Sequence, residues 1–169
     1  MVAAYRFSNE LRYRDATHPQ QTQLTPKYVL SPVREALGGK IGLDPCTLAD
    51  NPTEAERFYF LPMDGLQLPW DSKSIFCNPP YGKAKEPWVD RCIQSGEGGV
   101  SVILLIPAHT DTRTFQKAAR SADGVVFVRG RLKFGIPRRN GRQIAASHGS
   151  ALICWNADPD PLKHLGWTV

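Results

Sequence analysis

An almost unbroken apolar run over residues 100–106, ended by Pro107, is the feature that most constrains how this chain folds. A strand of this kind has no side left for solvent, so it is typical of a central parallel strand that is covered on both faces. Shorter apolar stretches predict further strands at residues 41–43, 58–60, 74–77, 124–128 and 150–155. The spacing of apolar residues predicts helices at residues 25–37, 86–95 and 111–122.

The order of these elements predicts an α/β fold. Strands that alternate with helices form an open, mostly parallel sheet with right-handed crossovers, flanked by helices. A chain of 169 residues suits one compact domain, which we expect over residues 25–169, after a polar N-terminal arm at residues 1–24. Ligand sites in such folds lie at the carboxyl ends of the strands. This rule selects Asp44, residues 78–81 and residues 107–110.

The composition excludes several other classes of protein. The four cysteines are scattered without a CxxC pair, and the four histidines show no metal-ligand spacing, so we expect no metal site. No apolar stretch is long enough to span a bilayer, and the N-terminal residues do not resemble a secretion signal. We therefore expect no membrane partner and a cytoplasmic location with reduced thiols.

The chain carries a formal charge of +5, and its basic residues gather in one segment. Residues 129–142 contain no acidic residue and six basic ones, which are Arg129, Arg131, Lys133, Arg138, Arg139 and Arg142. Such a segment is compatible with a polyanionic partner. The alternative interpretation is a solvated loop, or the solvent-facing side of a strand that carries Arg131 and Lys133.

The chemically most informative motif is Asn78-Pro79-Pro80-Tyr81, which follows the apolar stretch 74–77. The Asn78 side-chain carbonyl and the Pro79 backbone carbonyl can accept both hydrogens of an exocyclic aromatic amine and aim its lone pair at a methyl group. Consecutive prolines restrict φ and stiffen the loop that presents these acceptors. Tyr81 offers a flat face on which a base can stack. The alternative is an ordinary proline-rich turn after a strand.

Together with other short elements, this motif resembles the phage-type DNA N-6-adenine methyltransferases (Dam-like). Residues 78–81 are similar to the NPPY motif of amino-directed methyltransferases. The further similar elements are Leu24-Thr25-Pro26, Gly42-Leu43-Asp44, Asp64-Gly65-Leu66 with Trp70, Phe76 and Cys77 with Trp88, Leu105-Ile106-Pro107 with Thr110-Asp111-Thr112, Gly130 to Phe134, and Ser147 to Leu152. Their order and spacing over most of the chain make the resemblance fairly specific.

The resemblance implies a Rossmann-like methyltransferase fold that binds S-adenosylmethionine and methylates the N-6 amine of adenine in DNA, in a bacterial or phage-infected cell. It assigns catalysis to Asn78, Pro79, Pro80 and Tyr81. It assigns cofactor binding to Thr25, Pro26, Asp44 and Asp64. Phe134 would form a second aromatic wall of the base pocket. The basic residues expected to contact DNA with it are Arg131, Lys133, Arg138, Arg139 and Arg142.

The turn after the first predicted strand departs from the wider methyltransferase pattern. It reads Asp44-Pro45-Cys46-Thr47-Leu48-Ala49, without a glycine-rich GxG loop, and the phage-type branch is similarly reduced. Enzymes that methylate RNA or protein glutamine also carry NPPY, although the glutamine enzymes usually have the glycine-rich loop and an added helical domain. An RNA or glutamine methyltransferase, or a nucleic-acid-binding relative without catalysis, is therefore the alternative. The sequence predicts no oligomeric state.

Overall fold

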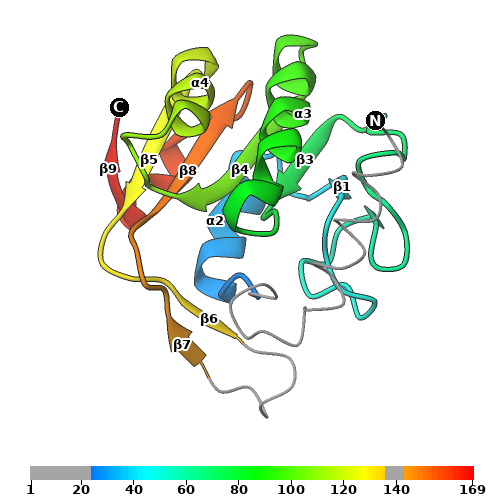
Figure 1. The fold of residues 1–169 in the computed structure, drawn as a ribbon, viewed down its shortest axis with the longest axis horizontal. Helices are drawn as coiled ribbons and strands as arrows, with labels where there is room; N and C mark the ends of the chain where they lie inside the picture. The colour runs from blue at the N-terminus through cyan, green and yellow to red at the C-terminus, as the bar shows by residue number, and fades with distance from the viewer. Residues whose placement is uncertain (1–23, 136–142) are drawn as a thin grey trace.

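The computed structural model describes residues 24–135 and 143–169. Within these residues, seven strands form one sheet in the order β2-β1-β3-β4-β8-β5-β9 (Figure 1). Its strands are β1 (Leu43–Asp44), β2 (Arg57–Phe58), β3 (Ser74–Cys77), β4 (Ser101–Pro107), β5 (Gly124–Val128), β8 (Ser150–Trp155) and β9 (Gly166–Thr168). A separate two-stranded sheet pairs β6 (Lys133–Gly135) with β7 (Gln143–Ala145). The predicted α/β fold is confirmed.

The main sheet is mostly parallel in strand direction. Strands β2, β1, β3 and β4 pair in parallel. Strand β8 runs antiparallel to both of its neighbours, β4 and β5, so that β5 regains the direction of β4. Strand β9 then pairs antiparallel with β5 at one edge. The expectation of a central parallel strand at 100–106 therefore needs a correction, because β4 has one parallel and one antiparallel neighbour.

Helices cover both faces of the sheet (Figure 1). The helical elements are α2 (Lys27–Ala36), the 3-10 helix η1 (Gly82–Lys85), α3 (Glu86–Glu97), α4 (Arg113–Ser121) and the 3-10 helix η2 (Asp160–Leu165). One core contains α2 and η2, and the other contains α3 and α4. Strand β4 divides its side chains between them: Ile103 faces the α2 core, whereas Val102 and Leu104 face the α3 core. Full burial of these side chains explains the unbroken apolar run.

Two predicted helix starts are wrong by one or two residues. Helix α2 begins at Lys27, with Pro26 rather than Thr25 at the N-cap position and no side-chain cap. Pro26 is extended, at φ −61° and ψ 145°, and its carbonyl accepts the first hydrogen bonds of the helix. In α4 the cap is Thr112, whose hydroxyl accepts from the Phe115 N–H, instead of Thr110 or Asp111.

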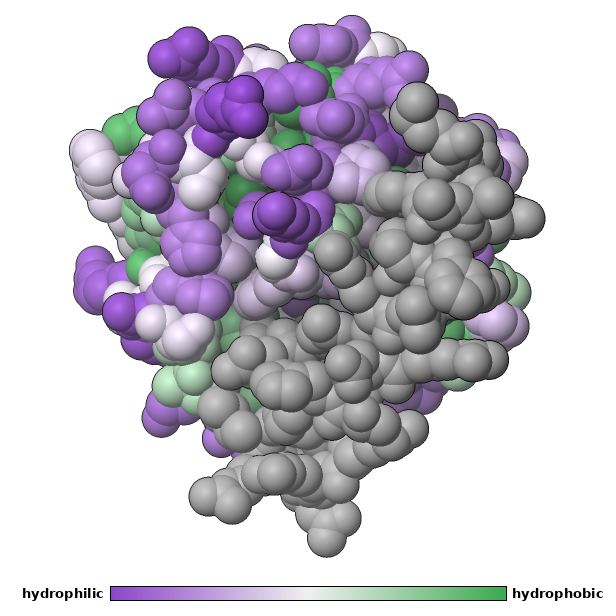
Figure 2. All heavy atoms as spheres, in the orientation of Figure 1, coloured by the Kyte–Doolittle hydropathy of each residue, from purple (hydrophilic) through white to green (hydrophobic). Residues whose placement is uncertain are grey.

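Strands β7 and β9 were not predicted from the sequence, and β6 agrees only with the alternative interpretation of a strand that carries Lys133. Residues 133–135 show only one apolar side chain, and 166–168 contain no apolar run, so neither has the pattern of a buried strand. Pairing with a partner strand decides both of them. The outer surface over α3 and α4 is mainly hydrophilic in the view of Figure 2. No helix in the described part of the chain is long and apolar enough to cross a membrane.

Candidate active site

The loop 78–81 begins where β3 ends, beside the turn that follows β1. Strands β1 and β3 are neighbours in parallel register, with Leu43 opposite Ile75, so Asp44 and Asn78 leave the same edge of the sheet. The Cys46 thiol lies 3.7 Å from the Cys77 thiol and also reaches the backbone of Asn78. The structure therefore brings together two of the segments that strand order selected.

Asn78 is tied to a segment far away in the sequence. Its Nδ2 donates a hydrogen bond of 3.0 Å to the Thr25 hydroxyl, 53 residues earlier. Both residues are half-buried. The segment before α2 thus contacts the loop 78–81 directly. The cofactor contact that the resemblance implies for Thr25 and Pro26 stays a prediction.

Tyr81 stands between two other rings. Its ring centroid is 6.3 Å from that of Phe134, which meets it edge-on at 82°, and 5.9 Å from that of His148, tilted by 54°. The hydroxyl is buried and has no hydrogen-bond partner among the described residues. Burial raises the pKa of this phenol above its ordinary value, so Tyr81 stays neutral.

Phe134 supports Tyr81 from inside the protein. Its side chain is 1% exposed and belongs to the α2 core. A ring with no exposed face can stiffen Tyr81 without touching a base, so the part of Phe134 as a pocket wall stays a prediction. His148 is half-buried and is the more accessible ring beside Tyr81.

Sequence reasoning selected His109 at a strand end but did not predict that it pairs with His148 next to Tyr81. The rings of His109 and His148 lie 4.7 Å apart, and the Ser147 hydroxyl is 2.8 Å from His148 Nδ1. Burial lowers the pKa of His148, and the nearby His109, Arg131 and Lys85 lower it further, which favours the neutral imidazole. The position of His109 at the end of a predicted strand was the one available signal. His148 lies in the element Ser147 to Leu152 that carried the resemblance, but no role was assigned to it.

Asp44 is engaged within the protein. It is 2% exposed, its Oδ1 accepts from the Cys46 N–H at 3.1 Å, and its Oδ2 accepts from the Thr53 hydroxyl at 2.8 Å. Burial raises the pKa of Asp44 to about 6, although the hydrogen bonds from Thr53 and Cys46 oppose the shift. These contacts fix the turn after β1, whatever else the carboxylate binds.

Asp64 lies in a half-exposed turn that packs on the turn after β1. Its Oδ1 accepts from the Leu66 N–H at 3.1 Å. A Cβ at Gly65 would stand 1.9 Å from the Pro45 carbonyl oxygen, so only glycine permits this approach of the two backbones. The Trp70 indole donates to the Gly65 carbonyl at 2.8 Å and holds the turn there. The two acidic turns that the resemblance assigned to the cofactor are therefore in contact.

A family model described as "DNA N-6-adenine-methyltransferase (Dam)" matches residues 16–166. The chain belongs to this Dam family. It is 27% identical over 146 residues to a DNA N-6-adenine-methyltransferase of Escherichia phage T1, a match that covers 84% of this chain and 59% of that protein. It is 28% identical over 105 residues to a DNA N-6-adenine-methyltransferase of Haemophilus phage HP1, covering 62% of this chain and 60% of that protein. The chain thus spans about three fifths of the length of these relatives.

Among solved structures, this Dam-family chain is similar to a SAM-dependent O-methyltransferase from Thermotoga maritima. The TM-score is 0.45 at 12% identity, over 85% of this chain and 69% of the other.

The structure describes two of the basic residues of this Dam-family chain that were expected to contact DNA. Arg131 and Lys133 are exposed, while the intervening Leu132 and the next residue, Phe134, are buried. This alternation, which runs from the residues before β6 into the strand, places both cations on the solvent-exposed side. Arg138, Arg139 and Arg142 lie outside the described residues.

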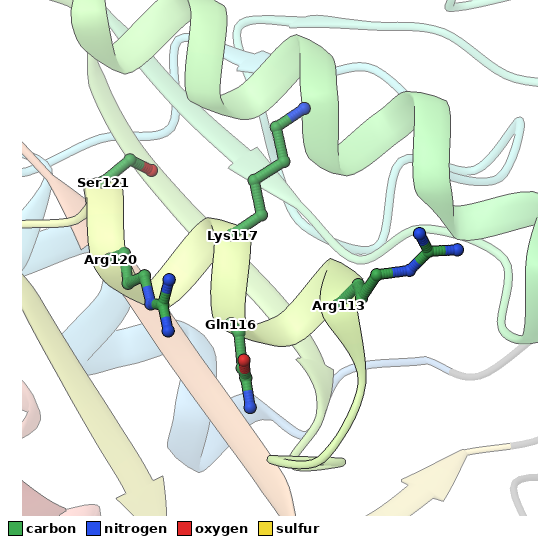
Figure 3. Close-up of a pocket in the computed structure, with 5 residues that line it drawn as sticks. All are labelled: Arg113, Gln116, Lys117, Arg120 and Ser121. Carbon is green, nitrogen blue, oxygen red and sulfur yellow. The ribbon is translucent and has the colours of Figure 1, made fainter.

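A shallow hollow on α4 is separate from the loop 78–81 (Figure 3). Its lining is polar and basic, and Lys117 reaches toward α3, where it pairs with Asp90 at 2.7 Å. The residues around it are Arg113, Gln116, Lys117, Arg120 and Ser121. None of them comes from the turn after β1 or from the loop after β3, so this hollow is not the candidate active site. No cluster of metal-binding side chains occurs in the described ranges, 24–135 and 143–169.

Proposed function

We propose that this chain transfers a methyl group from S-adenosylmethionine to the exocyclic N-6 amine of adenine in DNA. The observation that carries the proposal is the loop Asn78-Pro79-Pro80-Tyr81 at the carboxyl end of β3, beside the turn after β1, in a member of the Dam family. The two phage relatives are named for this activity. The reaction forms a C–N bond at the amine and breaks the S–CH₃ bond of the cofactor.

The loop supplies the acceptors that the amine needs. An exocyclic amine carries two hydrogens, and the Asn78 Oδ1 and the Pro79 carbonyl are two acceptors on adjacent residues. Hydrogen bonds to both would pull the nitrogen toward a tetrahedral geometry and direct its lone pair. The sulfonium of the bound cofactor supplies an activated methyl group, so positioning carries most of the remaining barrier. The nitrogen becomes acidic as the methyl group is transferred, and it would release its proton to water.

The geometry also suits a base that has left the double helix. An adenine inside duplex DNA cannot reach a loop at a sheet edge, so it must be extruded. Tyr81 would then stack on it. Since the phenol hydroxyl has no partner within the described residues, the ring and not the hydroxyl is the useful part of this side chain.

The turns after β1 and before β3 fit a nucleoside cofactor. Asp64 is half-exposed, and its second carboxylate oxygen makes no hydrogen bond among the described residues, which suits a ribose or an adenine donor. Asp44, whose two oxygens are already engaged, would shape the site from behind. Thr25 and Pro26 border the loop 78–81 from the other side.

Substitution of Asn78 tests the proposal. Asn78→Ala should keep the fold and cofactor binding but lower the single-turnover rate on adenine-containing DNA by about 10² to 10³, as does the loss of a well-placed polar group in other enzymes. Asn78→Asp should lose less, because a carboxylate still accepts from the amine. Methyl transfer is measured by nucleoside analysis, with calorimetry of cofactor binding and thermal melting as controls.

Two results would count against the proposal. A folded Asn78→Ala protein that methylates at the parental rate would remove Asn78 from the mechanism. Methylation of RNA or of glutamine peptides, with no product in single- or double-stranded DNA, would identify the wrong substrate and leave the loop chemistry standing.

A further inference from the structure

We infer that Thr25 is a positioning residue that sets the orientation of the Asn78 side-chain amide. The inference rests on the proposed function and adds a residue to its mechanism. The carrying observation is the 3.0 Å hydrogen bond from Asn78 Nδ2 to the Thr25 hydroxyl oxygen, between segments 53 residues apart. Through this bond the segment before α2 acts on the amine acceptor at the end of β3.

The backbone on each side of Thr25 is fixed, so its hydroxyl has a defined place. Leu24 makes two backbone hydrogen bonds with Gly135: its N–H donates at 3.1 Å, and its carbonyl accepts at 3.2 Å. On the other side, the Pro26 carbonyl accepts from the N–H groups of Val29 and Leu30 at 2.9 and 3.1 Å. Thr25 therefore spans a strand-like bridge and a helix start, and neither allows it to move freely.

The bridge between Leu24 and Gly135 is also connected to Tyr81, through Phe134. Gly135 ends β6, and its neighbour Phe134 meets Tyr81 edge-on at 6.3 Å. The two ends of the loop 78–81 are thus supported from one place: Asn78 through Thr25, and Tyr81 through Phe134. These contacts at both ends hold the Asn78 acceptor and the Tyr81 ring in a fixed position relative to each other.

The orientation of the amide decides whether Asn78 can accept from an amine. A side-chain amide carries donors on nitrogen and an acceptor on oxygen, and rotation by half a turn exchanges them. With Nδ2 donating to Thr25, Oδ1 points away from Thr25. A rotated amide would present its own N–H groups to the hydrogens of the target amine, donor against donor. Thr25 fixes the plane and the sense of the amide before the base arrives.

The matched pair Thr25→Val and Thr25→Ser isolates the hydroxyl. Valine keeps the shape of threonine and removes the hydroxyl, whereas serine keeps it. A hydrogen bond of this type contributes about 0.5 to 1.5 kcal/mol, so the single-turnover rate of Thr25→Val should fall about 2- to 12-fold. Thr25→Ser should restore most of that rate. The rates are compared at saturating cofactor, and calorimetry gives the cofactor Kd of the parent, Val and Ser proteins, so that any effect on cofactor binding is measured separately.

A double substitution separates positioning from a general structural effect. In an Asn78→Asp background the side chain has two equivalent oxygens, so rotation by half a turn does not change the groups that it presents. Thr25→Val should therefore cost less there than in the parent, a non-additivity expected only of groups that act on one another. Equal cost in both backgrounds would overturn the inference, and so would a parental rate for Thr25→Val in the Asn78 protein.

Two further measurements complete the test. If Thr25→Val lowers the rate only by weakening cofactor binding, Thr25 is a cofactor contact and the inference fails. The ¹⁵N signal of the Asn78 side-chain amide reports the orientation without any turnover: it should be sharp in the parent and in Thr25→Ser, and shifted or exchange-broadened in Thr25→Val. A parent with an ordered amide but no DNA methylation would defeat the proposed function alone, and an amide signal unchanged by Thr25→Val would defeat this inference alone.

Discussion

The Tyr81 side chain combines a partly exposed ring with a buried hydroxyl. The hydroxyl is buried with no partner in the described structure, although a buried polar atom normally has one. The ring contacts Phe134 and His148 and keeps part of its surface exposed. The hydroxyl and the ring can therefore be tested separately.

Tyr81→Phe should leave stability unchanged or raise the free energy of unfolding by up to about 1 kcal/mol, because an unpaired buried hydroxyl is removed. It should also keep most of the turnover. Tyr81→Ala should weaken capture of the extruded base by about 1 to 3 kcal/mol, seen as a raised KM for DNA. Thermal melting and steady-state kinetics check both variants. A Phe variant as impaired as the Ala variant would show that the hydroxyl has a partner in the working complex.

At the scale of elements, the turn after β1 depends on a buried carboxyl group. Asp44 joins Cys46 and Thr53, and Gly65 packs its backbone on Pro45. The turn has no glycine-rich loop, so side-chain hydrogen bonds and one close backbone approach do the work of shaping it. Because burial raises the pKa of Asp44 to about 6, the folded turn binds a proton more tightly than the unfolded chain does.

This shift predicts a pH dependence of stability. The folded pKa of about 6 lies above the unfolded value of 3.8, so ionisation of Asp44 destabilises the fold as pH rises through that window. The free energy of unfolding of the parent, relative to Asp44→Asn, should fall by about 2 to 3 kcal/mol between pH 4 and pH 7. Urea unfolding at each pH measures it. Asp71→Asn is the control, because Arg57 lowers the pKa of Asp71. The free energy of unfolding of the parent, relative to Asp71→Asn, should not fall with rising pH. Parallel profiles for parent and Asp44→Asn would refute the prediction.

At the scale of the whole molecule, the charge is +5 and part of it lies beside the candidate site. Arg131 and Lys133 are exposed on β6 and the residues before it, and Lys85 and Arg131 are close enough to act on His148. A polyanion that reached Tyr81 would pass these cations.

DNA binding should therefore weaken steeply with salt. If Arg131 and Lys133 each contact one phosphate, changing both to Ala should reduce the slope of log K against log salt by about 2. Lys40→Ala with Lys163→Ala is a matched control: the charge change is equal, and both lysines are exposed in ion pairs with Glu56 and Asp160. Fluorescence anisotropy at several salt concentrations gives the slopes. Equal slopes for the two double variants would show that Arg131 and Lys133 do not contact DNA.

The sequence by itself determined the elements whose residues are buried on both sides. Strands β3, β5 and β8 have the predicted bounds, because an apolar run followed by a break depends only on local composition. The position of the loop 78–81 at a strand end follows from its prolines, which cannot continue a ladder.

Only the tertiary structure decided which strands pair and which side chains meet. Strand β8 enters between β4 and β5 in reverse, although its apolar pattern is equally suited to a parallel place. The tertiary structure also decided the contact of Thr25. The sequence predicts a helix cap there, whereas in the fold its hydroxyl accepts a hydrogen bond from Asn78. The contact between His148 and Tyr81 likewise depends on the tertiary structure and not on the residues next to either ring. Such contacts join segments far apart in the chain, and the energy that selects them comes from packing the whole sheet and its two layers of helices.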